Sequence, residues 1–590
     1  MSKWLLTNKK ADFKALARAN GIDQVTARVM VNRGVAEEDF DAYLYPSLDQ
    51  IRNPHDLKDV DRAADLLSEA IDAGKKIRII GDYDIDGIQS TYILHQALLT
   101  CQADVDYVLP KRIEDGYGLN SHLVEDANES GVSLIITCDN GIAAKEAIAR
   151  AKDLGMMVIV TDHHEVPFAM ADGKRLDRLP PADAIVNPKQ ADCPYPFKEI
   201  CGAVVAWKLV FVLYEKRGVS VTLAMDFLEN AAFATVGDVM PLVDENRTIV
   251  SLGLERLRKT SNPGMAALMR VREIDPDHLS AYHIGFILGP CLNAAGRLET
   301  AEKSTRLLEE KEPEKAWVLA EDLAALNETR KAMTARGLED AFAQIKEGDY
   351  AKDPVLVIYL PKLHESIAGL VAGKVKESLW RPCFILTDAS AEGLVKGSGR
   401  SIPPYSMFEE MNRCKDLMVQ FGGHPMAAGL SLRRDKIDSL RRALNANCTL
   451  TEDDLLPKIR IDVPMPLHYI TISLVEELKR LEPFGNGNPK PLFAVRNVLV
   501  RSLRTMGREG QFLKFSLREG SSEVEGVYFG DARAFSTAVE EAYGQGSWEE
   551  FCHGFRRDLV VRMVYEPQIN FYRGRKSLQL VIREIEPEGD

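Results

Sequence analysis

Residues 77–87 read IRIIGDYDIDG, a mostly apolar run that leads into three carboxylates spaced two residues apart. An apolar run that ends at a glycine is typical of a buried strand followed by a turn. Asp82, Asp84 and Asp86 therefore stand at the end of a predicted strand, where alternate carboxylates can converge on a hard divalent cation. The stretch predicts a strand and, directly after it, a metal site.

The pattern Asp-x-Asp-x-Asp-Gly also opens an EF-hand calcium loop, which needs a bidentate Glu at its twelfth position. Counted from Asp82, that position is Ile93, inside an apolar run with helical character over residues 91–99. This excludes the EF-hand. A solvated acidic turn remains the alternative as long as the stretch is taken alone.

Two further segments repeat the arrangement of an apolar run followed by polar groups. Residues 134–141 read LIITCDNG, residues 157–164 read MVIVTDHH, and the segment between them, 142–154, has helical spacing. Strands that alternate with helices predict a parallel sheet under covering helices, with the ligand site at the carboxyl ends of the strands. Asp84, Asp139 and His163 fall at such ends. Carboxylates with one or two histidines suit Mn²⁺ or Mg²⁺ better than a zinc site built from thiolates does.

These motifs, in this order, resemble those of the DHH phosphoesterase superfamily and in particular its RecJ branch. Asp162-His163-His164 resembles the signature of the superfamily, and Asp238 stands where the fourth motif has its acid. The matching segments are 81–87 for the first motif, 139–142 for the second, 234–242 for the fourth, and 32–34, 45–46 and 53–57 for the start of the chain. The resemblance covers nearly the whole chain.

The resemblance implies a site for two cations, bridged by Asp139, with Asp84 on one side. The implied metal ligands are Asp82, Asp84, Asp86, Asp139, His163 and Asp238, and the implied catalytic set is Asp84, Asp86, Asp139, His163, His164 and Asp238. His164 would touch the scissile phosphate, and Asp162 would orient a ligand histidine. One departure concerns Asp82: many members of the superfamily carry a ligand histidine where this chain has Ile80, whereas the RecJ branch commonly has Asp at position 82.

Composition agrees with a multidomain enzyme of the cytoplasm. The chain has 590 residues, of which 45% are hydrophobic and 27% charged, and these are globular values. No stretch approaches the roughly 18 consecutive apolar residues of a membrane span, and the first residues do not predict a secretory signal. The nine cysteines form no CxxC pair, which argues against disulfides and a structural zinc and for a reducing compartment.

The net charge of −14 argues against bulk, non-specific binding of nucleic acid. It does not exclude a basic path inside an acidic molecule. An acidic metal-binding cleft needs cationic neighbours if it is to accept phosphate groups.

Pattern changes along the chain predict an α/β protein with several bodies. The fold expected is a parallel-sheet DHH domain joined by a long helix to a second α/β domain of DHHA1 type, plus a C-terminal OB-fold barrel. The predicted segments are an N-terminal helical lead (1–45), the DHH domain (46–260), a helical connector (261–350), the DHHA1 domain (351–455) and the OB-fold domain (456–590).

The second α/β body contains several glycine-rich segments with Arg or His beside them. Glycines this dense allow the backbone to approach a phosphodiester closely, although tight turns alone are the competing explanation. By resemblance to DHHA1 domains, Ser398 and Arg400 contact nucleic acid and His424 lies beside the cleft.

Other candidate substrate contacts lie outside that body. Arg112 follows a predicted strand, and residues 288–297, with Asn293 and Arg297, resemble a RecJ stretch that often carries Arg where this chain has Cys291.

From about residue 456 onward, many short strands with one helix near residues 473–481 predict a small barrel. Phe571 and Arg573 belong to a segment in which basic residues stand among aromatic ones, and Arg501, Arg504 and Arg508 form another basic cluster. OB-folds hold single strands by aromatic stacking and phosphate-tracking cations. A solvated barrel edge is the alternative.

The resemblance implies an exonuclease that degrades single-stranded DNA in the 5′→3′ direction by two-metal hydrolysis, in repair and recombination. It further implies a monomer that works with a single-strand-binding protein and a helicase and not at a membrane. Two rivals remain. Other DHH phosphoesterases act on nanoRNA or cyclic dinucleotides, but they are shorter and lack a terminal barrel. Inactive DHH scaffolds of the replication machinery have lost metal ligands, whereas every acidic motif is intact here.

Overall fold

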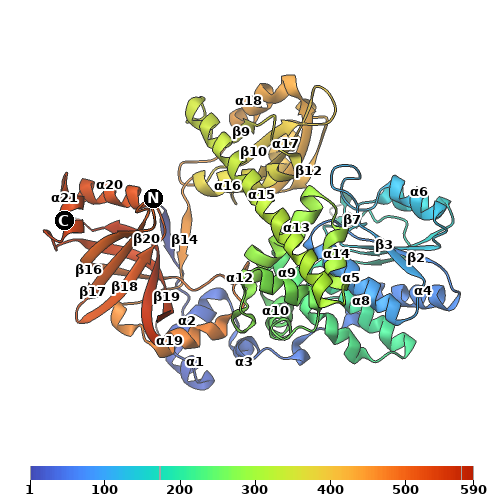
Figure 1. Ribbon diagram of the computed structural model, residues 1–590, viewed down its shortest axis with the longest axis horizontal. Coiled ribbons are helices and arrows are strands. Elements are labelled where there is room, and N and C mark those ends of the chain that lie inside the picture. The colour runs from blue at the N-terminus through green and yellow to red at the C-terminus, as the bar shows by residue number, and fades with distance from the viewer. Residues whose placement is uncertain (1, 172–173, 573, 589–590) are drawn as a thin grey trace. The chain divides into compact units, whose positions relative to one another are not determined.

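The computed structural model describes residues 2–171, 174–572 and 574–588, and its chain divides into two compact units. One unit combines residues 1–47 with 458–590, and the other spans residues 48–457. Figure 1 shows both units. Within the described residues, no helix is long and apolar enough to cross a lipid bilayer.

The larger unit contains a five-stranded parallel sheet. In spatial order its strands are β3 (Val105–Val108), β2 (Ile77–Ile80), β4 (Leu134–Cys138), β5 (Met157–Thr161) and β8 (Ala184–Val186). Ile80 pairs with Thr137, and Thr137 pairs with Val160, so the carboxyl ends of β2, β4 and β5 end at the same edge. The parallel sheet predicted from the alternating strands and helices is confirmed.

Helices cover both faces of this sheet because its strands are apolar on both sides. Ile79 packs into the core under α4 (Val60–Asp72), α5 (Ile85–Thr100) and α8 (Gly202–Arg217). Ile80 points the other way, into the core under α6 (Ser121–Glu129) and α7 (Lys145–Asp153). A two-stranded hairpin, β6 (Phe168–Ala171) and β7 (Lys174–Asp177), follows β5.

A helical segment follows the sheet and ends in the predicted connecting helix. Its elements are α9 (Leu228–Gly237), α10 (Asp244–Leu257), α11 (Pro263–Val271), α12 (Ala281–His283), the π-helical turn η6 (Ile284–Leu288), α13 (Gly289–Leu298), α14 (Glu302–Glu309) and α15 (Pro313–Glu347). α15 is 35 residues long, with Pro313 in its first turn, where a missing N–H costs nothing. The long helix expected between the two α/β bodies is present.

The second α/β body of this unit is built on a mixed sheet. Its strands, in spatial order, are β12 (Gln420–His424), β13 (Ala427–Arg433), β11 (Leu394–Arg400), β10 (Cys383–Asp388) and β9 (Leu356–Tyr359). β9 and β10 are parallel, and the other pairs are antiparallel. Its helices are α16 (Glu365–Leu379), α17 (Met407–Arg413) and α18 (Ile437–Asn447).

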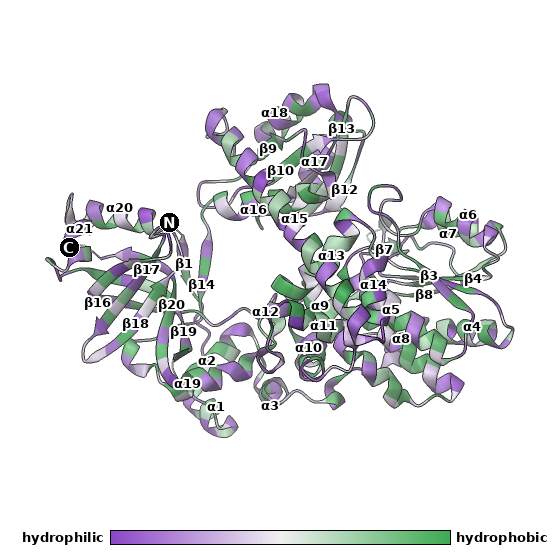
Figure 2. Ribbon diagram, in the orientation of Figure 1, coloured by the Kyte–Doolittle hydropathy of each residue, from purple (hydrophilic) through white to green (hydrophobic). Residues whose placement is uncertain are grey.

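The smaller unit is a closed barrel. Its strands are β16 (Phe493–Met506), β17 (Phe512–Glu519), β18 (Ser522–Tyr528), β20 (Arg575–Pro587) and β19 (Val560–Tyr572), and β19 pairs again with β16. A short strand, β15 (Val463–Pro464), pairs in parallel with the start of β16. Buried and more exposed residues alternate along β17, and Figure 2 shows hydrophilic and hydrophobic residues mixed along the strands of the barrel. The predicted OB-fold is confirmed.

Helices and the N-terminal segment complete this unit. α1 (Phe13–Asn20), α2 (Gln24–Arg33) and α3 (Phe40–Leu44) form the expected helical lead, and β1 (Lys3–Leu6) pairs with β14 (Lys458–Ile461). α19 (Ile472–Leu478) corresponds to the one helix predicted in the barrel. α20 (Ala532–Tyr543) and α21 (Ser547–His553) were not predicted; they contribute Phe535, Val539 and Phe551 to the barrel core.

Candidate metal centre and strand-end pocket

The turn between β2 and α5 places the first carboxylates. Asp84 caps α5, because its side chain accepts hydrogen bonds from the N–H groups of Asp86 and Gly87 at 3.0 and 3.3 Å. A Cβ at Gly87 would lie 2.4 Å from the carbonyl oxygen of Asp82, so only glycine allows the first turn of α5 to pack on this backbone. Asp82 and Asp86 are fully buried as a result.

The turn after β4 places Asp139. Its backbone is left-handed, with φ of 61°, and its side chain is almost fully buried. The side-chain amide of Asn140 fixes this turn by donating to the carbonyl oxygens of Ile80 and Cys138 at 3.0 and 2.9 Å. Asn140 thereby ties the ends of β2 and β4 together and brings Asp139 beside the first carboxylates.

In the Asp162-His163-His164 segment after β5, both carboxylate oxygens of Asp162 accept hydrogen bonds from other groups of the protein. Asp162 accepts hydrogen bonds from the N–H groups of His163 and Ile142 at 2.7 and 2.9 Å, and its Oδ1 lies 2.8 Å from Nδ1 of His164. Burial alone would raise the pKa of Asp162, but the hydrogen bond and charge of His164 lower it to about 2. Asp162 therefore orients the ring of His164 and fixes the backbone of both histidines.

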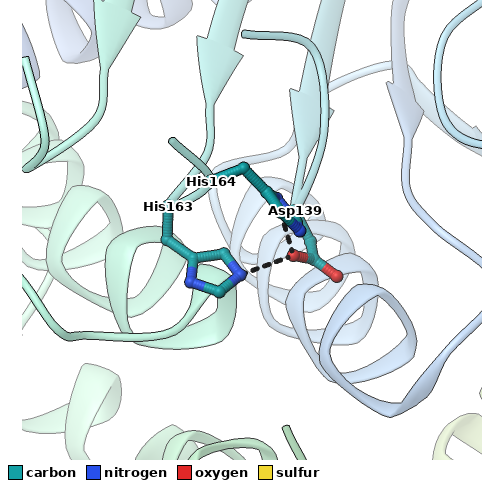
Figure 3. Close-up of side chains that lie close together, drawn as sticks. All are labelled: Asp139, His163 and His164. Carbon is teal, nitrogen blue, oxygen red and sulfur yellow. Dashed lines mark ion pairs between the residues drawn. The ribbon is translucent and has the colours of Figure 1, made fainter. Parts of the chain in front are cut away.

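His163 points into the carboxylates. Its Nε2 lies 3.1 Å from Oδ1 of Asp139, 3.5 Å from Oδ2 of Asp86 and 3.6 Å from Oδ2 of Asp238. Figure 3 shows the side chains of His163 and His164 turned toward Asp139, with dashed lines to its carboxylate. Asp238 directly follows α9, so residues from four separate segments meet here.

The ligand atoms fall into three groups, in each of which all atoms lie within 4.8 Å of one another. The groups are Asp82 with Asp84 and Asp139, Asp86 with His163 and Asp238, and Asp139 with His163 and His164. The structure thus brings together every residue that the sequence proposed as a metal ligand, with Asp139 in two of the groups.

The donor set fits hard divalent cations. Both side-chain oxygens of Asp82 are buried without a hydrogen-bond partner. Burial, and next the charge of Asp84, raises the pKa of Asp82 well above its ordinary value. For Asp139, burial and next the charge of Asp86 have the same effect on the pKa. Burial of charged carboxylates is unfavourable, and carboxylates this close also repel one another. A bound divalent cation would offset both the cost of burial and the repulsion.

Asp86 has partners that the sequence reasoning missed. The N–H groups of Gly202 and Ala203, at the start of α8, donate to its two carboxylate oxygens at 2.6 and 2.7 Å. A Cβ at Gly202 would lie 2.8 Å from Cβ of Asp139. The only signal in the sequence is a glycine before a long apolar segment, which does not reveal its distant partner.

Tyr117 was also missed. Its hydroxyl donates to the carbonyl oxygen of Asp139 at 2.8 Å and lies 3.2 Å from the ring nitrogens of His164. Burial lowers the pKa of His164, but the hydrogen bond and charge of Asp162 outweigh it and raise the pKa to about 9. This shift favours the protonated ring, which is held between Tyr117 and Asp162.

A cationic pocket of about 530 Å³ adjoins the carboxylates within the same unit. Of the predicted substrate contacts, it is lined by Arg112, Arg297, Ser398 and Arg400. Tyr83 also lines it, with the Arg112 guanidinium 3.7 Å from the centre of its ring. We name this cavity the strand-end pocket.

The arginines of the strand-end pocket are held by the protein. Arg297 donates to the carbonyl oxygen of Ser366 at 2.9 Å, and Arg400 donates to Oγ of Ser398 at 2.9 Å. Burial, and next the charge of Arg112, lowers the pKa of Arg297 to about 10. Several guanidinium groups around one cavity repel each other, and an anion in the cavity would relieve that repulsion.

The other predicted contacts differ in their surroundings. His424 lies at the end of β12, with its pKa lowered by burial and then by the charges of Arg400 and His164. Oδ1 of Asn293 is buried without a hydrogen-bond partner. Phe571, on the barrel, is 63% exposed, with Nζ of Lys576 5.4 Å from its ring. Arg573 lies outside the described residues.

Cys291, which stands where the resembling RecJ stretch often carries Arg, does not line the strand-end pocket. Its side chain is fully buried in the core, and its thiol donates to the carbonyl oxygen of Ile287 at 3.2 Å. Cys291 faces Asn327 of α15, whereas Arg297, farther along α13, reaches the strand-end pocket. An arginine at position 291 would need space in a packed core, so we expect Cys291→Arg to disturb folding and not to sharpen end recognition.

Three family models match the chain. They are the DHH family N-terminal domain over residues 76–235, the DHHA1 domain over 352–449 and the RecJ OB domain over 461–584. The matched ranges lie inside the segments 46–260, 351–455 and 456–590 that the sequence predicts.

Curated relatives and solved structures match nearly the whole chain. The single-stranded-DNA-specific exonuclease RecJ of Bacillus subtilis (strain 168) is 34% identical over 99% of this chain and 70% of the relative. The protein of the same name from Escherichia coli (strain K12) is 34% identical over 90% of this chain and 91% of the relative. The crystal structure of RecJ from Thermus thermophilus in complex with Mn²⁺ matches with a TM-score of 0.81 and 27% identity, over 100% of this chain and 80% of that one. The crystal structure of its complex with Mg²⁺ matches with a TM-score of 0.75 and 25% identity, over 100% of this chain and 79% of that one. On this identity and coverage, the chain belongs to the RecJ family.

Proposed function

We propose that this protein is a 5′→3′ exonuclease that hydrolyses single-stranded DNA to nucleotides with two divalent cations, Mn²⁺ or Mg²⁺. The observation that carries the proposal is the position of Tyr83. Its ring lines the strand-end pocket, while its neighbours Asp82 and Asp84 belong to the carboxylate groups. A strand end held in the pocket is therefore one residue away from the proposed metal ligands.

The roles proposed for the ligands follow from the groups described above. Asp82 and Asp84 would hold one cation with Asp139, and Asp86, His163 and Asp238 would hold the other, which Asp139 would share. When bound, two such cations activate a water molecule and stabilise the leaving oxygen of a phosphodiester. The amides of Gly202 and Ala203 keep the Asp86 carboxylate in place.

His164 contributes positive charge from the protein itself. Its side chain is half exposed, whereas that of His163 is buried, so His164 is the histidine that a substrate can reach. The contact with Asp162 raises the pKa of the ring and so favours its protonated form. We assign to His164 a charge-assisted hydrogen bond to the scissile phosphate, with Tyr117 fixing the plane of its ring.

The polarity proposed here assigns the strand-end pocket to a terminal 5′ phosphate. Arg112, Arg297 and Arg400 offer guanidinium groups, which suit bidentate contacts with phosphate, and Ser398 offers a hydroxyl. A Cβ at Gly369 would lie 2.8 Å from Nη2 of Arg400 and 2.9 Å from Oγ of Ser398, so this glycine keeps both groups accessible. Asn293 and His424 are proposed as further contacts along the cleft.

The barrel is proposed to bind the strand farther from its end. Phe571 presents an exposed ring on which a base can stack, and Arg573 of the same segment would contact phosphate. We further propose that the protein acts as a monomer in the cytoplasm, in repair and recombination. A helicase or single-strand-binding protein would supply its substrate, since the proposed enzyme cuts only unpaired strands.

One assay tests the proposal. Linear DNA and RNA strands labelled at either end, and a circular DNA strand, are incubated with Mn²⁺, Mg²⁺ or EDTA. We expect nucleotides released from the 5′ end of linear DNA with either metal, and no cleavage of circles or in EDTA. Equal release from both ends would contradict the polarity, and cleavage of circles would contradict the exonuclease assignment.

A further inference from the structure

A helix that runs past the metal ligands carries an exposed aromatic pair at its far end. The helix is continuous from Ala281 to Leu298 and consists of α12, the π-helical turn η6 and α13. π-helical turns are rare and occur frequently at functional sites. One face of this helix packs in the hydrophobic core, since Ile284, Leu288 and Leu292 are fully buried.

The helix packs directly on the turn that holds the first carboxylates. A Cβ at Gly296 would lie 2.2 Å from the carbonyl oxygen of Tyr83, and a Cβ at Gly289 would lie 2.9 Å from Cδ1 of Ile85. These two glycines bring the helix against Tyr83 and Ile85, which stand between the three carboxylates of the turn. At its C-terminal end, Arg297 lines the strand-end pocket.

Toward the other end, Tyr282 and Phe286 point into solvent. Tyr282 is 57% exposed and Phe286 is 69% exposed, and their rings stack with centroids 5.0 Å apart and planes 27° apart. Near this pair the helix packs on α9, because a Cβ at Gly285 would lie 3.7 Å from Cγ1 of Val236, close before Asp238. Two large rings kept in water on the helix that also lines the strand-end pocket need a reason other than packing.

The length of the helix sets which part of a strand could reach the pair. A rise of about 1.5 Å per residue puts Phe286 about 16 Å, and Tyr282 about 22 Å, from Arg297 along the axis. A strand with stacked bases advances about 3.4 Å per nucleotide, so Phe286 is within about five nucleotides of the strand-end pocket. An extended strand would reach it in fewer.

We propose that Tyr282 and Phe286 form a stacking platform for nucleobases of the single-stranded substrate, a few nucleotides from the end that is cut. The inference rests on the proposed function. The occupant is a nucleobase because one helix joins the strand-end pocket, the metal-binding turn and the aromatic pair. Stacked rings take bases of any sequence, which suits an exonuclease that degrades strands of any sequence.

Photocrosslinking tests where the strand lies. Strands that carry one 5-iodouracil at successive positions from the 5′ end are irradiated with the full-length protein in EDTA, which keeps them intact. We expect crosslinks to Tyr282 or Phe286 from about the third to the sixth nucleotide, as the spacing above requires. Crosslinks from these positions to other residues only would overturn the proposal.

Kinetics test whether the pair contributes binding. In Tyr282→Ala/Phe286→Ala, we expect KM for strands of about twenty nucleotides to rise about tenfold or more, while dinucleotide cleavage stays unchanged. Tyr282→Phe keeps a ring and should retain normal KM. Phe168→Ala, on the β6–β7 hairpin, removes a ring that is 52% exposed and serves as the matched control.

The outcomes separate this inference from the proposed function. An unchanged KM for long strands in the double variant would overturn the platform while the wild type still degrades DNA. A KM change of the same size in Phe168→Ala would overturn it too. A wild-type protein without activity on single strands would instead contradict the proposed function. A thermal melt checks that the double variant is folded.

Discussion

At the scale of single residues, the metal centre depends on glycines that let backbone approach carboxylates. Gly87 admits the first turn of α5 beside Asp82, and Gly202 admits the start of α8 beside Asp139. Gly202 does more than leave space, because its N–H also donates to Asp86. The geometry of the carboxylates is therefore set by backbone groups that carry no chemistry themselves.

Asp139 is the residue on which both proposed cations depend. We expect Asp139→Asn to lower the hydrolysis rate at least about a thousandfold, because a two-metal site contributes several kcal/mol of transition-state stabilisation. Strand binding in EDTA should persist, since the strand-end pocket is untouched. Asp226→Asn, an exposed carboxylate, is the control. Activity within about tenfold of the wild type would contradict the bridging role.

Gly202→Ala tests the glycine itself. The added Cβ would lie 2.8 Å from Cβ of Asp139, so either α8 or Asp139 must shift. We expect weaker Mn²⁺ binding in isothermal titration calorimetry and a lower hydrolysis rate in a folded protein. Gly285→Ala is the control, because its nearest neighbour is 3.7 Å away. Wild-type Mn²⁺ affinity in Gly202→Ala would show that the close approach does not matter.

Arg400 tests the assignment of the strand-end pocket. We expect Arg400→Ala to reduce the preference for 5′-phosphorylated over 5′-hydroxyl strands by about tenfold, since one charge-assisted hydrogen bond contributes about 1.5–3 kcal/mol. Competition between the two strands measures this directly. Arg434→Ala removes an exposed arginine paired with Asp388 and should leave the preference intact. Equal effects of both variants would contradict the assignment.

At the scale of elements, the sequence predicts the strands that have clear boundaries. It does not predict contacts between residues that are distant in the sequence. β2, β4 and β5 were predicted as apolar runs that end at Gly or Asp, and their ends bring Asp84, Asp139 and His163 together. This works because parallel strands share one edge. Tyr117 and Gly202 were missed because their partners are distant in sequence. The burial of Cys291 could not be predicted, because resemblance gives a position in a motif but not the face of the helix that the residue occupies.

α8, whose first amides hold Asp86, is itself fixed by a buried ion pair. Nζ of Lys208 lies 2.7 Å from Oε1 of Glu245 on α10, with side chains 1% and 0% exposed. Glu245 also accepts from Tyr195 and from the N–H of Arg52. The pair therefore joins α8 to α10, which follows Asp238.

Removing one member of this pair should be costly. We expect Lys208→Met to lower the free energy of unfolding by about 3–5 kcal/mol, because Glu245 is left buried without its cation. Lys208→Met/Glu245→Gln should recover part of the loss. Lys216→Met, on the same helix, removes a pair with the exposed Asp65 and should cost about 0–1 kcal/mol. Denaturant unfolding measures all three, and similar losses for Lys208→Met and Lys216→Met would show that the buried pair is not special.

At the scale of the whole molecule, the N-terminal and C-terminal segments of the chain belong to the same compact unit. β1, from the first residues, pairs in parallel with β14, and α1 and α2 contribute to the core of the barrel unit. Residues 48–457 form the other unit, which contains all the proposed metal ligands and the strand-end pocket. A deletion that separates the two units must therefore remove residues 1–47 together with 458–590, since the N-terminal helices would otherwise lose the core they pack on.

The fragment of residues 48–457 tests how the two units divide the work. We expect it to cleave dinucleotides at a rate near that of the full chain, because the metal-binding groups and the strand-end pocket are complete. Its affinity for long single strands should fall much more, since stacking and phosphate contacts add with each nucleotide bound. Phe571→Ala in the full chain removes one exposed ring and leaves the rest of the barrel in place. We expect this variant to bind long single strands about tenfold more weakly, which is part of the loss expected for the fragment. Titrations with strands of increasing length distinguish the two contributions: the affinities of fragment and full chain should agree for the shortest strands and diverge as length grows. Equal affinities of the fragment and the full chain at all strand lengths would mean that the barrel does not hold the strand. The exposed Phe571 ring would then need another partner.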